Sequence, residues 1–205
     1  MNNRAMLVQL IGEYQIKQVK RDGESCFVLS SGKHTRMKYD FERLFQHISP
    51  RRQFAEAFAV MFARSSLSRF ITVLVGPEST GLFLEELIQY HQPFQTKSVA
   101  LAEKDGKGGF LLMASFVPRL SDRYLIVDDV LTTGRTLCGI RRALREGVGF
   151  KTGHDPDIVG GAVIVNRMPE HGALVPYVPE PLVSLLYDNE YPVYASNECP
   201  FCNHS

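Results

Sequence analysis

The sequence predicts an α/β fold, with a mostly parallel sheet that carries helices on both faces. Residues 70–75, 124–127 and 158–165 are apolar runs without the alternation typical of half-exposed strands, so both faces of these strands should be buried. Amphipathic helical patterns separate the runs between residues 50 and 165. Strands linked through helices run parallel, because the chain crosses back over the sheet before it adds the next strand.

Composition narrows the class of protein. The chain has 205 residues, 23 basic against 22 acidic side chains, and a formal net charge of +1. This length predicts one domain, residues 1–205. The balanced charge argues against nucleic acid or an anionic membrane as a partner. No apolar stretch has membrane-spanning length and no signal-peptide pattern is present, so the four cysteines indicate a reducing, cytoplasmic location.

The predicted domain has three parts. Residues 50–165 form the α/β core, residues 1–45 contribute to a hood above the carboxyl edge of the sheet, and residues 166–205 form a C-terminal segment. A helix follows the strand at 124–127, and we expect it to stop around Gly147 and Gly149, because glycine commonly ends helices.

Two carboxylates and a polar turn follow the strand at residues 124–127. Asp128 and Asp129 come directly after it, at the end of the strand where ligands of open α/β sheets bind. The turn that opens the next helix consists of Thr132, Thr133, Gly134, Arg135 and Thr136. Its unpaired backbone amides and the positive end of the helix dipole would bind an anion. Carboxylates accept hydrogen bonds from vicinal hydroxyls, so the combination predicts a sugar phosphate ligand; a merely structural strand end and capped helix is the alternative.

Residues 127–136 resemble the signature of the type I phosphoribosyltransferases. That signature is a hydrophobic run, two acidic residues, two hydrophobic residues and then Thr-Thr-Gly-x-Thr, and this chain matches it residue for residue. The resemblance implies that the turn holds the 5'-phosphate of phosphoribosyl pyrophosphate. It also implies that Asp128 and Asp129 position the ribose hydroxyls, directly or through a metal ion.

A second strand is followed by a polar turn of the same kind. Residues 70–75 lead into Gly76 and Pro77, and a helical run begins at residue 82. The residues between them are Glu78, Ser79 and Thr80. In the family that the chain resembles, this loop contacts the pyrophosphate, and we expect the same here.

A charged, glycine-rich segment at residues 103–109 separates two extended segments. Such a hairpin is typical of a flap that closes over a reactive ligand and excludes water; a mobile loop without a role is the alternative. The resemblance to the phosphoribosyltransferases implies that a lysine of this segment meets the charge of the leaving group, with Lys104 the first candidate and Lys107 the second.

The amino-terminal part of the chain is similar to the orotate phosphoribosyltransferases. These enzymes carry an aromatic residue, a short strand, Ser-Gly, a basic residue, Ser or Thr and then Tyr. The matching residues are Phe27, Leu29, Ser31, Gly32, Lys33, His34, Thr35 and Tyr39. The segments at residues 102–104 and 198–202 follow patterns of the same family. The resemblance implies that Arg167, Ser31 and Lys33 contact the base.

The implied activity is transfer of phosphoribosyl from phosphoribosyl pyrophosphate to orotate, which gives orotidine monophosphate and pyrophosphate. Mg²⁺ is the expected cofactor, held indirectly by Asp128 and Asp129 through ligand or water oxygens. Family members usually form homodimers, so a homodimer is expected. Two alternatives remain: a phosphoribosyltransferase for a purine or another base, and a non-catalytic regulator that binds phosphoribosyl pyrophosphate.

Cys199 and Cys202 have the spacing of a metal-binding pair, and His204 follows them. A structural zinc site needs four ligands, and the sequence contains no second Cys-x-x-Cys pair to complete them. The sequence alone therefore leaves open whether these cysteines bind a metal.

Overall fold

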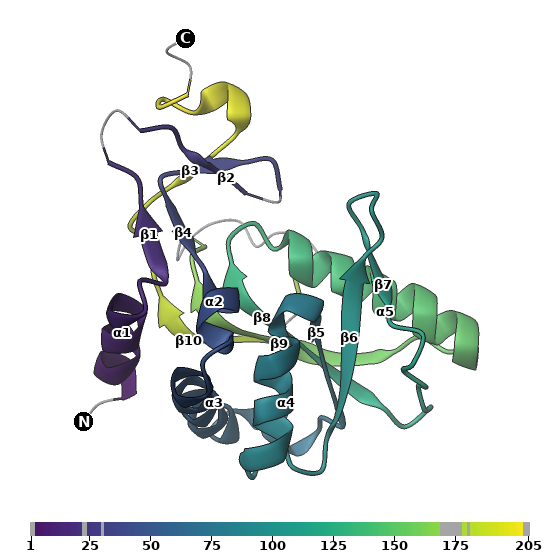
Figure 1. The fold of residues 1–205 in the computed structure, drawn as a ribbon. Helices are drawn as coiled ribbons and strands as arrows, with labels where there is room; N and C mark the ends of the chain where they lie inside the picture. The colour runs from purple at the N-terminus through teal and green to yellow at the C-terminus, as the bar shows by residue number, and fades with distance from the viewer. Residues whose placement is uncertain (1–2, 22–23, 30, 169–177, 180, 203–205) are drawn as a thin grey trace.

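The computed structural model of the chain describes residues 3–21, 24–29, 31–168, 178–179 and 181–202. Its centre is a six-stranded sheet in the order β10-β9-β8-β5-β6-β7 (Figure 1). The strands are β5 (Val73–Pro77), β6 (Ser98–Lys104), β7 (Phe110–Leu112), β8 (Arg123–Leu131), β9 (Asp157–Asn166) and β10 (Leu182–Tyr187). Neighbouring strands pair in parallel except β7, which pairs antiparallel with β6. The predicted α/β fold is confirmed.

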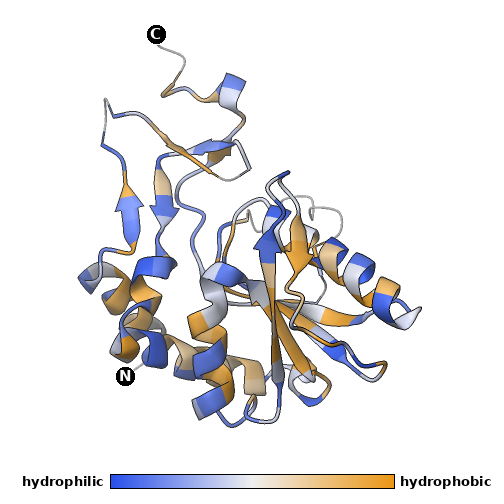
Figure 2. Ribbon diagram, turned by 45° about the vertical axis from the view of Figure 1, so that its right-hand side comes forward, coloured by the Kyte–Doolittle hydropathy of each residue, from blue (hydrophilic) through white to orange (hydrophobic). Residues whose placement is uncertain are grey.

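Helices cover both faces of this sheet. α3 (Ile48–Ala63) and α4 (Gly81–Tyr90) pack against one face, and α5 (Arg135–Thr152) packs against the other. The side chains of β8 alternate between the two cores, with Leu125 and Val127 on the α3–α4 side and Tyr124 and Ile126 on the α5 side. Both faces of β8 are buried, which explains its unbroken apolar run. Figure 2 shows the hydrophobic colouring of the strands in the centre of the sheet.

The core on the α3–α4 side is rich in phenylalanine. α1 (Asn3–Glu13), α2 (Phe41–Phe45) and the short turn η1 (Ser66–Arg69) add to it. Its buried rings are those of Phe41, Phe45, Phe54, Phe58, Phe62, Phe83 and Phe94. Glu86 of α4 is buried beside them, and its carboxylate accepts from the Nε atoms of Arg51 and Arg52 at 3.2 and 2.9 Å. This ion pair satisfies a charge that burial would otherwise penalise.

The predicted stop of the long helix around Gly147 and Gly149 is wrong. α5 continues to Thr152 and ends at Gly153, whose φ of 74° is the left-handed conformation that glycine adopts at helix ends. Gly147 serves the packing of β7 instead, because a Cβ atom there would approach Leu112 within 3.2 Å.

A small lobe of short strands stands above the carboxyl edge of the sheet (Figure 1). β1 (Lys17–Val19) pairs antiparallel with β4 (Met37–Tyr39). β2 (Phe27–Val28), β3 (His34–Thr35) and β11 (Val193–Tyr194) form a second sheet in the order β11-β3-β2, and η3 (Ser196–Glu198) follows β11. We call the described residues within 17–39 and 191–202 the hood lobe. It joins an early and a late segment of the chain.

Of the helices that the structure describes, none is both long and apolar enough to cross a membrane.

Candidate active site

A cleft of about 320 Å³ opens between the carboxyl edge of the sheet, the β6–β7 hairpin and the hood lobe. β5 and β8 are neighbours at its floor, and the helices that follow them, α4 and α5, go to opposite faces of the sheet. This change of direction leaves a crevice between the two strand–helix turns, which is the common ligand site of open α/β sheets. A wider hollow of about 700 Å³ lies around Thr72, Ser98 and Asp122, but the predicted site residues do not line it.

The acidic pair lies at the floor of the cleft. Asp128 and Asp129 both line it, and Asp128 is only 5% exposed. One oxygen of Asp128 accepts from the Asp129 amide at 3.0 Å, and one of Asp129 accepts from the Val130 amide at 2.7 Å. Burial raises the pKa of Asp128 well above its usual range, and the neighbouring Asp129 carboxylate raises it further. Burial also raises the pKa of Asp129.

The turn predicted to bind phosphate forms a small hollow of its own beside the acidic pair. Thr132, Thr133, Gly134, Arg135 and Thr136 all line this hollow of about 20 Å³. Gly134 has φ 73° and ψ 0°, a left-handed conformation that costs glycine little, and it immediately precedes α5. Gly134, the N-cap residue, has no side chain to cap α5, and the first turn of the helix lines the hollow, a position that suits an anion.

The loop after β5 contributes unequally to the cleft. It forms the 3-10 turn η2 (Glu78–Thr80). Ser79 lines the cleft, whereas Glu78 is exposed and Thr80 is buried, and neither of these two lines it. The Thr80 hydroxyl donates to the Pro77 carbonyl at 2.8 Å, so it stabilises the turn itself.

The β6–β7 hairpin forms one wall of the cleft. Lys104 ends β6, is exposed and lines the cleft, whereas Lys107 lies at the hairpin tip and does not line it. Asp105 holds the tip, since its Oδ1 accepts from the amides of Lys107 and Gly109, each at 2.8 Å. These bonds lower the pKa of the Asp105 carboxyl.

Arg167 lines the opposite end of the cleft but is 4% exposed. Its Nη1 donates to the Met37 carbonyl at 2.9 Å, and its Nη2 donates to Thr35 Oγ1 at 3.2 Å and to the Tyr191 carbonyl at 3.0 Å. Its Nε is buried and has no partner among the described residues. Burial lowers the pKa of this guanidinium. Arg167 therefore ties the hood lobe to the end of β9.

Two predicted base contacts do not reach the cleft. Lys33 is exposed and Ser31 is partly buried, and neither lines it. The hood lobe presents Lys38 and Tyr39 of β4 to the cleft instead, together with Leu29. The Tyr39 hydroxyl donates to Asp188, which also pairs with Lys17 at 2.8 Å. Lys38 was not predicted from the sequence, because the family pattern directs attention to the Ser-Gly-Lys bend before it. The signal that could have identified Lys38 is its position next to Tyr39 of the same pattern.

Comparisons with known proteins bear on which family this site belongs to. No protein-family model matches the chain. An orotate phosphoribosyltransferase of Deinococcus radiodurans is 31% identical over 188 residues, which cover 90% of this chain and 89% of the relative. One from Thermus thermophilus is 28% identical over 180 residues, 87% of each chain. The crystal structure of the orotate phosphoribosyltransferase from Aeropyrum pernix has a similar fold, with a TM-score of 0.62 at 22% identity, over 89% of this chain and 94% of that one.

These similarities cover nearly nine tenths of the chain or more. They confirm the resemblance seen in residues 127–136 and in the amino-terminal pattern. The chain belongs to the orotate phosphoribosyltransferase family.

Proposed function

We infer that this protein transfers the phosphoribosyl group of phosphoribosyl pyrophosphate to orotate, giving orotidine monophosphate and pyrophosphate. The observation that carries this inference is the juxtaposition, in one cleft, of the acidic pair and the phosphate-type turn at the start of α5. An anion site beside two carboxylates matches the two ends of a ribose 5-phosphate. The choice of orotate as the base rests on the similarity to relatives that are orotate phosphoribosyltransferases.

The turn at residues 132–136 binds the 5'-phosphate through its backbone amides, and Asp128 and Asp129 accept hydrogen bonds from the ribose hydroxyls. Both carboxylates have raised pKa values in the free protein because they are buried. A ligand that brings hydroxyl donors or a cation favours their ionised form. Substrate binding and ionisation of the pair are thus coupled.

The donor set fits Mg²⁺, which prefers a few carboxylate oxygens together with phosphate oxygens. Asp128 and Asp129 are the carboxylates that line the cleft, and they would hold the ion indirectly, through ribose or water oxygens. When bound, Mg²⁺ offsets the charge of the pyrophosphate group.

The base approaches from the hood lobe. Orotate carries a carboxylate, and Lys38 is the lysine that this lobe presents to the cleft. Its ammonium group binds the orotate carboxylate, while Arg167 supports the segment that carries Lys38 by donating to the Met37 carbonyl. The Arg167 Nε has no partner among the described residues, but it is buried, so it would reach a carbonyl of the base only if the cleft rearranged around the ligand.

The reaction itself is a substitution at C1 of the ribose. A ring nitrogen of the base forms a bond to C1 as the bond from C1 to the pyrophosphate oxygen breaks. The electron pair leaves with pyrophosphate, and the proton of that ring nitrogen is released to solvent. Alignment of the two partners and stabilisation of the developing charges supply the catalysis. Ser79 and Lys104 border the space on the hairpin side, where the pyrophosphate departs. Lys104 compensates its charge when the hairpin closes.

We also propose that the chain works as a homodimer in the cytoplasm, as one domain. The family resemblance supports the dimer, and the described cysteines form no disulfide, which suits a reducing compartment.

The first test is a Mg²⁺-dependent assay with phosphoribosyl pyrophosphate and orotate, which follows the loss of orotate absorbance. Uracil, adenine, guanine, hypoxanthine and xanthine are assayed separately for pyrophosphate release. Turnover with orotate alone is expected. Turnover with a purine would favour the enzyme for another base, and calorimetric binding of phosphoribosyl pyrophosphate without any turnover would favour the regulator.

The role of Lys104 has its own test with a matched control. Lys104→Ala removes the lysine that lines the cleft, and Lys107→Ala removes one from the same hairpin that does not. We expect Lys104→Ala to lower kcat about 10²-fold or more, as expected for loss of a group that stabilises developing charge. Lys107→Ala should stay close to wild type. Equal kcat values for the two variants would remove Lys104 from the mechanism.

A further inference from the structure

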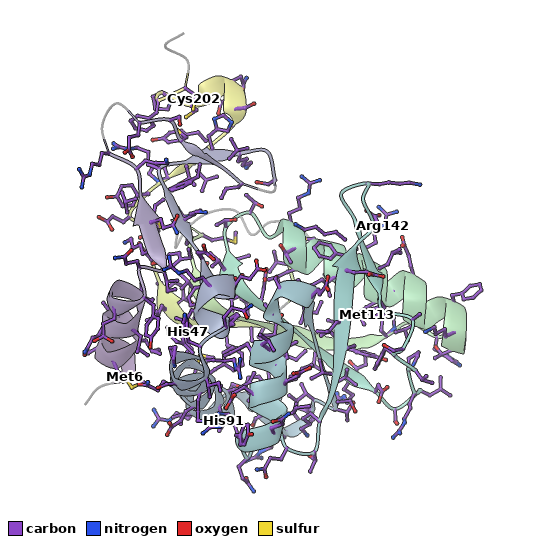
Figure 3. The ribbon with its side chains drawn as sticks, viewed as in Figure 1. Met6, His47, His91, Met113, Arg142 and Cys202 are labelled. Carbon is purple, nitrogen blue, oxygen red and sulfur yellow. The ribbon has the colours of Figure 1, made fainter. Side chains whose placement is uncertain are left out.

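Three cysteines and a histidine meet in the hood lobe, outside the catalytic cleft. Cys26, His34, Cys199 and Cys202 each offer one ligand atom, and these four atoms all lie within 4.8 Å of one another. Figure 3 shows Cys202 in this lobe, away from the sheet that forms the floor of the cleft. None of the four residues lines the cleft, so the function proposed above does not explain their proximity.

The distances suit a shared metal ion better than a disulfide. Cys26 Sγ lies 3.1 Å from Cys199 Sγ, well beyond the bonded distance of about 2.05 Å. His34 Nδ1 lies 3.2 Å from Cys202 Sγ. Ligands around a tetrahedral zinc ion, with zinc–sulfur and zinc–nitrogen distances of about 2.3 and 2.0 Å, stand roughly 3.5–3.8 Å apart. The His34–Cys202 pair would have to separate by about 0.3 Å, and the Cys26–Cys199 pair by about 0.7 Å, to reach that spacing.

Backbone pairing brings these residues together from both ends of the chain. His34 lies on β3, opposite Val28 of β2 on one side and Tyr194 of β11 on the other. Cys26 immediately precedes β2, and η3 leads from β11 to Cys199. The Cys202 amide donates to the Cys199 carbonyl at 3.3 Å, which folds Cys-Pro-Phe-Cys into a tight turn with both sulfurs near His34.

The hood lobe lacks the apolar core that would otherwise hold it together. Its three-stranded sheet is made of strands of two residues each. Of the described residues in the lobe, only Thr35, Met37 and Cys199 are buried. Small units without a sufficient core are commonly stabilised by disulfides or a structural metal. These cysteines form no disulfide, which leaves the metal.

We propose that Cys26, His34, Cys199 and Cys202 bind one zinc ion as a structural site. Three thiolates and one imidazole are a closed tetrahedral set, and soft sulfur ligands select zinc over Mg²⁺. Each thiol loses its proton to solvent as the ion binds. The ion joins the early and the late segments of the hood lobe, and so steadies β3 and the adjoining β4, which presents Lys38 and Tyr39 to the cleft.

The primary test is the metal content of the wild-type protein, purified without a histidine tag and without chelators. We expect about one zinc per chain by mass spectrometry of the elements. After removal of zinc, added Co²⁺ should give the thiolate-to-cobalt charge-transfer band and the visible bands of a tetrahedral site. A wild-type protein that contains no zinc and gives no thiolate–cobalt band would overturn the proposal, as would a Cys26–Cys199 disulfide found by non-reducing peptide mapping.

Single variants then assign the ligands. Cys26→Ser and Cys199→Ser should lose most of the zinc, and His34→Cys should retain it through a fourth thiolate. Cys138→Ser is the matched control, because this cysteine lies on α5 outside the cluster; it should keep one zinc per chain. Full zinc content in Cys26→Ser and Cys199→Ser would contradict the assignment. If these variants do not fold, the wild-type cobalt spectrum still decides, since its thiolate band scales with the number of sulfur ligands.

A final measurement links the site to the hood lobe independently of which base the enzyme uses. Removal of zinc with a zinc-selective chelator, at constant Mg²⁺, should lower the melting temperature and increase hydrogen exchange at the amides of β2, β3 and β11. Unchanged exchange in these strands after complete loss of zinc would mean that the ion does not hold the lobe. These readouts need no substrate, so their failure is distinct from failure of the proposed transferase activity.

Discussion

At the scale of single residues, Asp128 shows a conflict between binding and stability. Its carboxyl group is buried beside that of Asp129, and burial raises its pKa in the folded protein. A raised folded-state pKa means that folding favours the protonated form. The stability from this group is therefore complete below the unfolded pKa of about 4, and it is lost as the pH rises through the folded-state pKa.

Asp128→Asn tests this conflict. The amide cannot ionise, so the variant should melt a few degrees above wild type at pH 8, and the difference should shrink as the pH falls toward 5. Turnover should fall about 10²-fold or more, because the anionic acceptor for the ribose and Mg²⁺ is lost. Thermal unfolding across pH and the orotate assay measure both effects. Asp155→Asn, at an exposed aspartate just before the amino-terminal end of β9, is the control; a melting difference independent of pH would refute the argument.

Lys38 and Lys33 offer a sharper test of the base site. Lys38 lines the cleft, whereas Lys33 is exposed and does not. Lys38→Ala should raise the KM for orotate about 10- to 100-fold, as expected for loss of a hydrogen bond to a charged group, with a smaller effect on the KM for phosphoribosyl pyrophosphate. Lys33→Ala should leave both KM values nearly unchanged. The reverse pattern would restore the prediction made from the Ser-Gly-Lys motif.

At the scale of elements, the catalytic hairpin depends on glycines of the neighbouring helix. β7 packs against α5 where α5 carries Gly139 and Gly147. A Cβ atom at Gly139 would lie 2.6 Å from the Phe110 ring, and Phe110 lines the cleft. The position of β7, which forms part of the cleft wall, therefore depends on the absence of side chains at Gly139 and Gly147 of α5.

Gly139→Ala should displace Phe110 and lower kcat/KM about 10-fold, although alanine is the better helix former by about 1 kcal/mol. Gly149→Ala is the matched control, because the nearest atom to its added Cβ is a carbonyl oxygen at 3.9 Å. It should raise the free energy of unfolding by up to about 1 kcal/mol and leave activity unchanged. Urea unfolding and steady-state kinetics separate the two outcomes. Identical kinetics in both variants would show that β7 tolerates the shift.

These elements also show how far the sequence predicts the structure. The central strands were predictable, because a strand covered on both faces has no polar positions, as in residues 124–127. The acidic pair and the turn were predictable because strand, carboxylates and turn are contiguous in the chain. The end of α5 was not, since the role of Gly147 depends on Leu112 of another element. Lys38 and the neighbours of Cys199 could not be predicted for the same reason. Their surroundings depend on pairing between strands that are far apart in the sequence.

At the scale of the whole molecule, Arg167 connects the sheet to the hood lobe. It leaves the end of β9 and donates to Met37, Thr35 and Tyr191, which belong to both segments of that lobe. Asp188 at the end of β10 adds a second link through Tyr39 and Lys17. The placement of the lobe over the cleft thus depends on a few polar contacts to the sheet.

Arg167→Ala removes three hydrogen bonds that a buried guanidinium donates. Their three acceptor oxygens then lose this donor. We expect a loss of roughly 3 kcal/mol in the free energy of unfolding, and a larger rise in the KM for orotate than for phosphoribosyl pyrophosphate. Denaturant unfolding and kinetics measure the two parts. Arg145→Ala, an exposed arginine of α5, is the control and should change neither. An equal rise of both KM values would argue against a specific link between Arg167 and the base.

The hood lobe is built from two segments that are far apart in the sequence, so the ribosome makes them at different times. Cys26 and Cys199 are 173 positions apart. At 5–20 residues per second, a ribosome makes the second segment roughly 10–35 s after the first. During most of that interval β2 and β3 lack β11 as a partner, and Arg167, made 24 residues before Tyr191, lacks that carbonyl until the late segment follows. The hood lobe over the binding cleft is therefore completed only after residues 191–202 have left the ribosome.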